Sequence, residues 1–270
     1  MMVGQALSHP YLQNALAAGL LIALLAAGVG YFVVLRGAAF ATHALAQIGF
    51  AGAAGAVLLG FDPLVGLIAF AVTGAAGLGV RSAHSRTNDV TTALVLVTAL
   101  GTGALFLALA HSYAANVYAL LFGTIVGITR ADVATIAIAT VLIIGVLGGL
   151  TRPLLFATVA RGTAQTRGIP VATLDVAFLV LVGLTTAVTV PIVGTLLIYS
   201  LAIGPTAAAI RLTARPAWTV AVALAFSIFA VLVGIALAYV SDWPVGFFIA
   251  VLTALEYVAA LLCSRRRSMG

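Results

Sequence analysis

The chain has 270 residues, of which 64% are hydrophobic and only 7% are charged, and its mean hydropathy is +1.27. Soluble domains carry about a quarter charged residues, so this composition excludes a soluble globular domain and predicts a multi-pass membrane protein. The net charge of +6 is the balance of twelve Arg and six acidic residues, and there is no Lys. Basic residues in short loops are a common orientation signal of membrane proteins, which favours a membrane role over nucleic-acid binding.

The apolar runs of the chain predict helices. A helix needs roughly 20 mostly apolar residues to cross a hydrocarbon core about 30 Å thick, whereas the strands of a membrane barrel would alternate polar and apolar residues. We therefore expect an all-α polytopic membrane protein with a single transmembrane domain over residues 1–270. The first run is longer than a signal-peptide core and is predicted to remain as a helix. The runs are 15–35, 40–59, 64–80, 90–110, 114–128, 131–150, 171–189, 193–210, 217–239 and 245–262.

The Arg residues orient these runs through the positive-inside rule. If all ten runs crossed, the basic loops at 81–86 and 152–167 would lie on opposite sides. If the short run 114–128 instead enters and leaves on one side, every Arg except Arg130 faces the cytoplasm. This interpretation predicts about nine crossings and one short re-entrant or broken helix, with the N-terminus outside and the C-terminus in the cytoplasm.

The longest hydrophilic insert, residues 151–170, lies on the predicted inner side. It is long enough for a short cytoplasmic helix between Pro153 and the break at Gly168. An ordinary loop is the alternative interpretation of the same residues.

Pro191, Gly194 and the pair Gly204 and Pro205 interrupt two later apolar runs. Interrupted helices mark binding sites in many transporters, although Gly and Pro are also common in plain membrane helices. The interruptions alone leave both readings open.

Common enzyme motifs are missing from the sequence. A P-loop requires a Lys, so a chain without Lys does not hydrolyse ATP by that route. Neither the H-E-x-x-H motif of zinc proteases nor the G-x-S-x-G nucleophile elbow is present. These absences exclude a P-loop ATPase and the common hydrolase sites.

Two ionisable residues lie clearly inside apolar runs, where charge is costly and often functional: His43 and Glu256. Gln47 follows His43 by four residues and shares its helix face. A neutral imidazole binds borderline metals such as zinc, iron and nickel, and two copies of the pair across a two-fold axis would supply four ligands. The structural alternative is that both side chains hydrogen-bond to neighbouring helices. For Glu256, a packing partner, a protonated acid and a pathway charge all remain open.

Residues 35–52 resemble a motif of the permease subunit of bacterial ABC importers for zinc, manganese and iron, a type II importer family. The family motif reads approximately L-R-G-x-x-x-x-G-D-x-x-x-H-x-x-x-x-G, and the chain aligns with it without a gap from Leu35 to Gly52. His43 stands where the family has Asp, and Gln47 stands where it has His.

Three further blocks extend the resemblance over nearly the whole chain. LFGTIVGI at 121–128 is similar to the family's L-F-G-[DN]-[IL]-L-[AG]-[VI], with Thr124 at the Asp or Asn position. The stretch ending at Pro170 is similar to A-x-x-x-G-[IVM]-P, and residues 193–212 are similar to V-G-[TA]-L-L-[IL]-x-x-x-L-[IL]-x-P-A-A-x-A. The order and spacing of these blocks are specific.

The resemblance implies a type II importer-like helical bundle in the bacterial cytoplasmic membrane. It implies a second permease copy, a cytoplasmic ATPase pair and an extracytoplasmic metal-binding protein as partners. The transported divalent metal ion would be cargo, and no permanently bound cofactor is expected. The segment from Pro153 to Gly168 would be the coupling helix that receives the ATPase stroke.

The resemblance also assigns candidate roles to single residues. The metal candidates are His43 and Gln47; the coupling candidates are Arg161, Arg167 and Gly168; the pathway or packing candidates are Thr124 and Pro205, to which the position of Glu256 inside an apolar run adds a third. By this resemblance the chain would be a transport subunit and not an enzyme, with ATP hydrolysed by a separate ATPase chain. Two other functions remain: a type II ABC permease for a metal chelate of the siderophore or cobalamin kind, and a membrane-embedded enzyme or secondary carrier that works alone.

Overall fold

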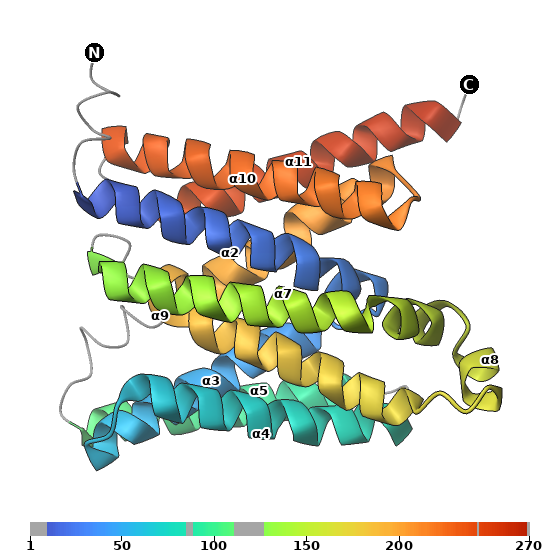
Figure 1. Cartoon of the computed structure of the whole chain (residues 1–270). Helices are drawn as coiled ribbons and strands as arrows, with labels where there is room; N and C mark the ends of the chain where they lie inside the picture. The colour runs from blue at the N-terminus through green and yellow to red at the C-terminus, as the bar shows by residue number, and fades with distance from the viewer. Residues whose placement is uncertain (1–9, 85–88, 111–126, 242, 269–270) are drawn as a thin grey trace.

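The computed structural model describes residues 10–84, 89–110, 127–241 and 243–268, and these residues form α-helices joined by short turns (Figure 1). The prediction of an all-α membrane bundle is confirmed. Eight of the described helices are long and apolar enough to span a membrane. They are α2 (Pro10–Leu35), α3 (Ala39–Leu59), α4 (Pro63–His84), α5 (Asp89–Leu109), α7 (Arg130–Val159), α9 (Val171–Leu212), α10 (Pro216–Ser241) and α11 (Val245–Ser268).

The long element α9 consists of two helices that meet at Gly194. This residue has φ 80° and ψ 162°, a left-handed-side conformation that glycine adopts without a steric penalty. Asp175, near the start of α9, pairs with Arg36 at the end of α2. Gly30, also near the end of α2, packs closely against Ala202 in the second half of α9. Both ends of α9 therefore lie at the same end of the bundle, and the chain reverses direction at Gly194.

The second half of α9 includes a shorter apolar helix, Leu197–Leu212. Together with the eight long helices it gives nine apolar helical segments within the described residues, in agreement with the predicted number of crossings. The predicted re-entrant segment 114–128 lies outside the described residues, apart from Gly127 and Ile128.

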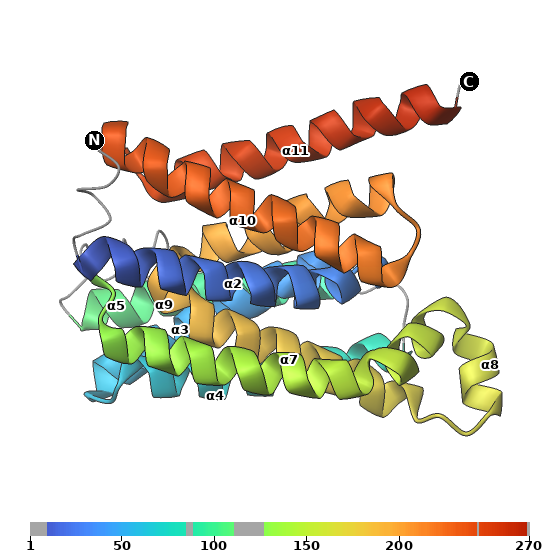
Figure 2. The same ribbon diagram turned by 45° about the horizontal axis from the view of Figure 1, so that its top comes forward.

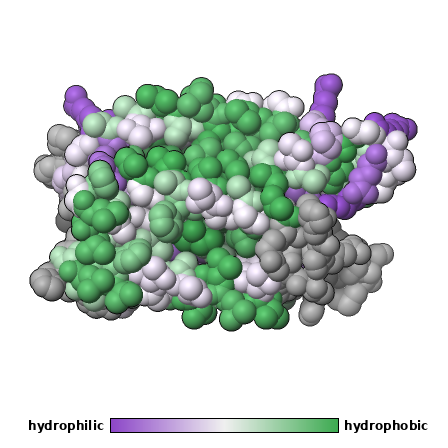
Figure 3. Space-filling view, turned by 90° about the horizontal axis from the view of Figure 1, so that it is seen from below, coloured by the Kyte–Doolittle hydropathy of each residue, from purple (hydrophilic) through white to green (hydrophobic). Residues whose placement is uncertain are grey.

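The helices form an inner and an outer set. α2, α3 and the first half of α9 are mostly buried, whereas α4, α5, α7, α10 and α11 expose many large apolar side chains. Figure 3 shows apolar side chains over the middle of one face and hydrophilic ones toward its two ends. This distribution fits a bundle whose outer helices face lipid, because lipid tails favour apolar side chains along the membrane core.

Small residues bring the inner and outer helices close together. A Cβ atom added to Gly52 in α3 would overlap the carbonyl oxygen of Gly66 in α4, and the reverse is also true. Membrane helices associate through such close backbone packing because lipid provides no hydrophobic driving force between them.

The two ends of the bundle are distinct (Figures 1 and 2). α2 begins at one end, and α11 ends at the other, where the short helix α8 (Arg161–Thr166) also lies. Exposed Trp218 near the start of α10 and exposed Trp243 just before α11 are separated by the length of α10. Such Trp residues commonly mark the two membrane interfaces.

The predicted helix between Pro153 and Gly168 is divided differently in the structure. α7 continues through Pro153 to Val159, and α8 has only six residues. Proline removes one helical hydrogen bond, but Leu154 and Ala157 beyond it are buried in the core. This packing keeps α7 helical past the proline.

Candidate metal-pathway site

His43 and Gln47 lie one turn apart on α3, as their spacing predicts. Gln47 is only 4% exposed, and His43 is partly buried. The imidazole meets the ring of Tyr199 edge-on, with 5.0 Å between the ring centroids and 62° between the ring planes. Tyr199 belongs to the second half of α9, so this contact joins α3 to the helix that follows the Gly194 break.

Two atoms of this pair are buried without a hydrogen-bond partner: His43 Nδ1 and Gln47 Oε1. More than about 90% of buried polar groups in proteins have a partner, and leaving one unsatisfied costs about 1–3 kcal/mol. For these two atoms the structural alternative, a hydrogen bond to a neighbouring helix, is not realised. A pair of unsatisfied nitrogen and oxygen atoms on one helix face is able to interact with a cation.

The described residues of this chain do not by themselves supply a complete metal site. No group of three His, Cys, Asp or Glu side chains occurs among them. Of the candidate pair, only His43 is partly exposed, while Gln47 is enclosed within the chain. A full coordination shell therefore needs ligands from outside this chain or a rearrangement of α3.

Tyr199 was not singled out from the sequence. It lies five residues after Gly194, inside the block 193–212 that resembles the family motif, but a tyrosine in an apolar run has no distinctive spacing. Its contact with His43 depends on how α9 packs on α3, which is a tertiary feature.

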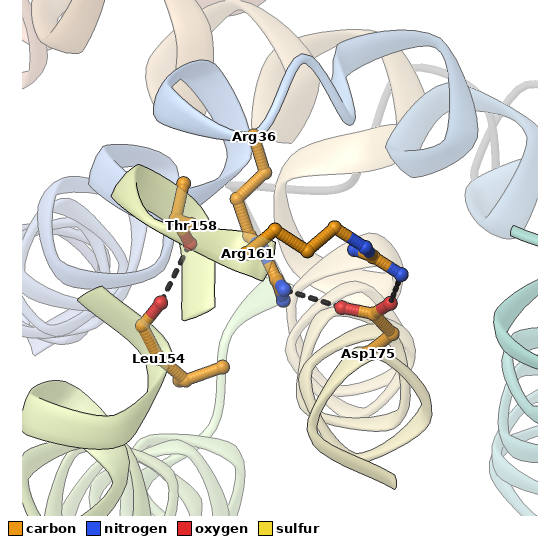
Figure 4. Close-up of polar contacts among 5 residues, drawn as sticks. All are labelled: Arg36, Leu154, Thr158, Arg161 and Asp175. Atoms are coloured by element: carbon orange, nitrogen blue, oxygen red, sulfur yellow. Dashed lines mark hydrogen bonds and ion pairs between the residues drawn. The ribbon is translucent and has the colours of Figure 1, made fainter. Parts of the chain in front are cut away.

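A charged cluster lies at the end of the bundle that carries α8 (Figure 4). The carboxylate of Asp175 accepts from Arg36 through Oδ1 and from Arg161 through Oδ2, the latter at 2.7 Å. The side chains of Arg36 and Asp175 are 9% and 8% exposed, whereas that of Arg161 is 44% exposed. The cluster joins the turn after α2, the start of α8 and the first turns of α9.

The environment of Arg36 combines desolvation with compensating charge. Burial lowers the pKa of its guanidinium, the adjacent Asp175 carboxylate opposes this shift, and the positive charge of Arg161 lowers the pKa further. The guanidinium carbon also lies 5.0 Å from the centre of the Phe178 ring. The arginine is thus held by a carboxylate and an aromatic face, which together offset the cost of its burial.

The coupling candidates lie on or beside α8. Arg161 begins the helix, and Arg167 follows it, with its guanidinium carbon 5.7 Å from the Phe156 ring of α7. Gly168 has φ 76° and donates its amide hydrogen to the Gln165 carbonyl, which closes the turn after the helix. The opposite face of α8 is anchored by the fully buried Ala164.

The remaining candidates from the sequence are Thr124, Pro205 and Glu256. Thr124 lies outside the described residues. Pro205 is buried in the second half of α9. Glu256, in α11, has both carboxylate oxygens buried without a hydrogen-bond partner. Thr253, one turn earlier on α11, packs against Gly204, so Glu256 lies on the face of α11 that meets the second half of α9.

The comparison with known families decides the class of protein. The ABC 3 transport family matches residues 8–264, which is nearly the whole chain. The chain belongs to this family. The resemblance to permeases of metal-ion ABC importers is confirmed, and so is the expectation of a transport subunit in place of an enzyme.

Two similar relatives have curated names. The chain is 28% identical over 98% of its length, and 91% of the relative, to the manganese transport system membrane protein MntC of Halalkalibacterium halodurans. It is 26% identical over 93% of its length, and 97% of the relative, to the high-affinity zinc uptake system membrane protein ZnuB of Haemophilus influenzae.

A solved structure has the same fold. PsaBC from Streptococcus pneumoniae, determined in complex with a Fab, gives a TM-score of 0.85 at 23% sequence identity. The likeness covers 96% of this chain and 93% of that chain. The helical arrangement described above is therefore shared with PsaBC.

Proposed function

We propose that the chain is the membrane-spanning permease of an ATP-driven importer for a divalent metal ion: manganese, zinc or iron. Two copies form the pathway between them, a cytoplasmic ATPase pair drives it, and an extracytoplasmic metal-binding protein delivers the ion. The single observation that carries the metal pathway is the pair of buried, unpartnered atoms His43 Nδ1 and Gln47 Oε1. Family membership and the names of the relatives support the class of cargo.

The ion makes a transient contact with His43 as it passes inward. A neutral imidazole nitrogen is a good ligand for borderline divalent metals, and an amide oxygen is a weaker one. Neither ligand carries negative charge, so the ion is held loosely. Loose ligation suits transport, because conduction requires that a bound ion also leaves.

Gln47 takes part only after a rearrangement. Its side chain is enclosed between α3 and its neighbours, and Tyr199 covers the adjacent His43. A shift of the second half of α9 relative to α3 would uncover both side chains. The break at Gly194 provides a place for such a shift, because the two halves of α9 are not one continuous helix.

The end of the bundle that carries α8 and the end of α11 faces the cytoplasm in this proposal. Arg161, Arg167, Arg211 and Arg215 lie near that end, as the positive-inside rule requires. The exposed residues of α8 and the turn at Gly168 then face the ATPase pair. α2 begins at the opposite, extracytoplasmic end.

Two other functions are alternatives to a metal-ion importer. A permease for a metal chelate would have no use for an unpartnered imidazole and amide in its interior. A carrier that works alone is disfavoured by membership of an ABC transport family.

The test is metal uptake by cells that carry His43→Ala. We expect metal-dependent growth and uptake of radioactive manganese or zinc to be lost, while the amount of folded permease in the membrane stays normal. Leu59→Ala, at the exposed end of the same helix, is the matched control and should transport normally. Full metal uptake by His43→Ala would exclude the pathway role of this histidine.

A further inference from the structure

Asp175 occupies the point where three parts of the chain meet. Arg36 lies in the turn between α2 and α3, Arg161 begins α8, and Asp175 is the fifth residue of α9. Each carboxylate oxygen accepts from a different arginine, as Figure 4 shows. The carboxylate is therefore a shared link, and neither arginine contacts it at the expense of the other.

The link is stiff on the side of α3. The amides of Arg36, Gly37 and Ala38 donate to the carbonyls of Phe32, Val34 and Val33, so the turn between α2 and α3 is fully hydrogen-bonded. His43 is the fifth residue of α3, about 6 Å along the helix from its first residue, Ala39. A displacement of Arg36 would therefore be passed to the His43 face of α3.

The link also reaches the other partner of the His43 contact. Asp175 lies in the first half of α9, and Tyr199 lies in the second half, beyond the Gly194 break. The two rings that meet 5.0 Å apart, those of His43 and Tyr199, thus belong to the two elements that the cluster ties to α8. A movement of α8 would therefore reach α3 through Arg36, and it would reach Tyr199 through the first half of α9 and across the Gly194 break.

The chemistry of the cluster suits a link that carries force. Arg36 and Asp175 are nearly excluded from solvent, and charge-assisted hydrogen bonds are about twice as strong as neutral ones. Arg161 is half-exposed on α8, where a docked partner can reach the helix. An amide at position 175 would keep the shape of the side chain but offer one acceptor oxygen to two guanidinium groups.

We propose that Asp175 is a positioning residue that fastens α8 to α3 and α9, so that movement of α8 under the ATPase pair opens and closes the His43–Tyr199 contact. This inference rests on the proposed function, because it assumes that an ATPase acts on α8. In this inference, Arg161 moves with α8 and displaces the carboxylate of Asp175. The displacement then reaches α9 through Asp175 itself and α3 through Arg36.

The experiment uses the whole transporter, reconstituted in liposomes with its ATPase and metal-binding protein. ATP hydrolysis and uptake of manganese or zinc are measured together and expressed as ions imported per ATP. In Asp175→Asn we expect the ATPase to remain bound and to hydrolyse ATP, while the ions imported per ATP fall about tenfold. A merely structural role would reduce both activities with the amount of folded protein and leave their ratio unchanged.

Variants of Arg161 provide a second measurement that does not risk the buried core, since this side chain is half-exposed. Arg161→Gln should lower the ratio as Asp175→Asn does, and Arg161→Lys, which retains a charged donor, should restore most of it. Arg152→Gln is the matched control, because it removes the same charge from an exposed position of α7. If Asp175→Asn does not fold, the three arginine variants decide the question.

The possible results separate the two proposals. Metal import by the wild-type transporter together with unchanged ratios in Asp175→Asn and Arg161→Gln would overturn the link and leave the proposed function intact. Absence of ATP-dependent metal import by the wild type would overturn the proposed function itself.

Discussion

Two of the polar regions in the described interior of the bundle, the Asp175 cluster and the His43 and Gln47 pair, differ in how their groups are paired. In the charged cluster, each oxygen of Asp175 has an arginine partner, although Arg36 and Asp175 are almost completely buried. At the His43 and Gln47 pair, no formal charge need be present, yet His43 Nδ1 and Gln47 Oε1 lack partners. The paired charges of the first region are typical of residues that hold helices together. The unpartnered atoms of the second region are typical of a ligand-binding position.

The difference follows from the cost of burying each kind of group. An isolated charge in a low-dielectric interior is so unfavourable that charges persist there only when paired. An unsatisfied neutral group costs about 1–3 kcal/mol, which a folded protein can tolerate at a functional position. Unpaired neutral groups and paired charges in the same bundle therefore point to different roles.

The largest expected effect tests the paired region. Asp175→Ala leaves the buried guanidinium of Arg36 without its carboxylate and brings it close to a second positive charge. Loss of one partner of a buried pair costs about 3–5 kcal/mol, and the exposure of Arg161 favours the lower end, about 3 kcal/mol. Denaturant-induced unfolding of the purified permease in detergent would measure this loss.

Asp62→Ala is the control for this variant. Asp62 is exposed and accepts from the amide of Leu64 at the start of α4, so its loss should cost about 1 kcal/mol, as for other helix caps. An Asp175→Ala variant no less stable than Asp62→Ala would show that the cluster is not a structural joint.

A smaller effect of opposite sign tests the unpaired region. Gln47→Leu replaces an amide whose oxygen has no partner with an apolar side chain of similar size. The free energy of unfolding should stay constant or rise by about 1 kcal/mol, because the variant removes an unsatisfied buried group. Metal uptake should fall in the same variant, so stability and function are expected to move apart.

Asn14→Leu makes the matched comparison with Gln47→Leu. The Asn14 amide donates to the carbonyl of Ile128 at 2.9 Å, so its replacement breaks a made hydrogen bond and should lower stability by about 1 kcal/mol. Equal losses in the two variants would mean that the Gln47 amide is satisfied in the folded protein, and its role as a waiting ligand would be rejected.

The sequence predicts the two regions unequally. Apolar runs long enough to cross a membrane set the helices, because hydrophobicity and backbone hydrogen bonding leave few other structures in lipid. The shared face of His43 and Gln47 follows from helical spacing alone. The Arg36 and Asp175 pair joins residues 139 positions apart and depends on packing. Its only sequence signal is that Asp175 lies just inside an apolar run, and this signal is weaker than those of His43 and Glu256, which lie deeper in theirs.

Helix boundaries at the end of the bundle that carries α8 were the other feature that the sequence predicted poorly. Pro153 favoured a helix start, whereas α7 runs past it because Leu154 packs into the core. Local propensity and tertiary packing compete at such a position, and packing prevailed. The coupling candidates on α8 were found by resemblance, and their connection to Asp175 became visible only in three dimensions.

The smallest expected effect separates the two ends of α8. Arg167 is exposed and interacts with the face of Phe156, with 5.7 Å from its guanidinium carbon to the ring centre. Exposed cation–π contacts contribute about 0.5–1 kcal/mol, so Arg167→Ala should lower the free energy of unfolding by about 0.5 kcal/mol. A double-mutant cycle with Phe156→Leu, which keeps apolar packing but removes the ring, would isolate this interaction. A second cycle would measure the coupling energy between Arg161 and Asp175. If the two coupling energies are equal, both ends of α8 are held equally strongly, and Asp175 contributes no more than Phe156 to holding the helix. A clearly larger value for the Arg161 cycle would mean that α8 pivots about its first residue, where the link to α3 and α9 begins.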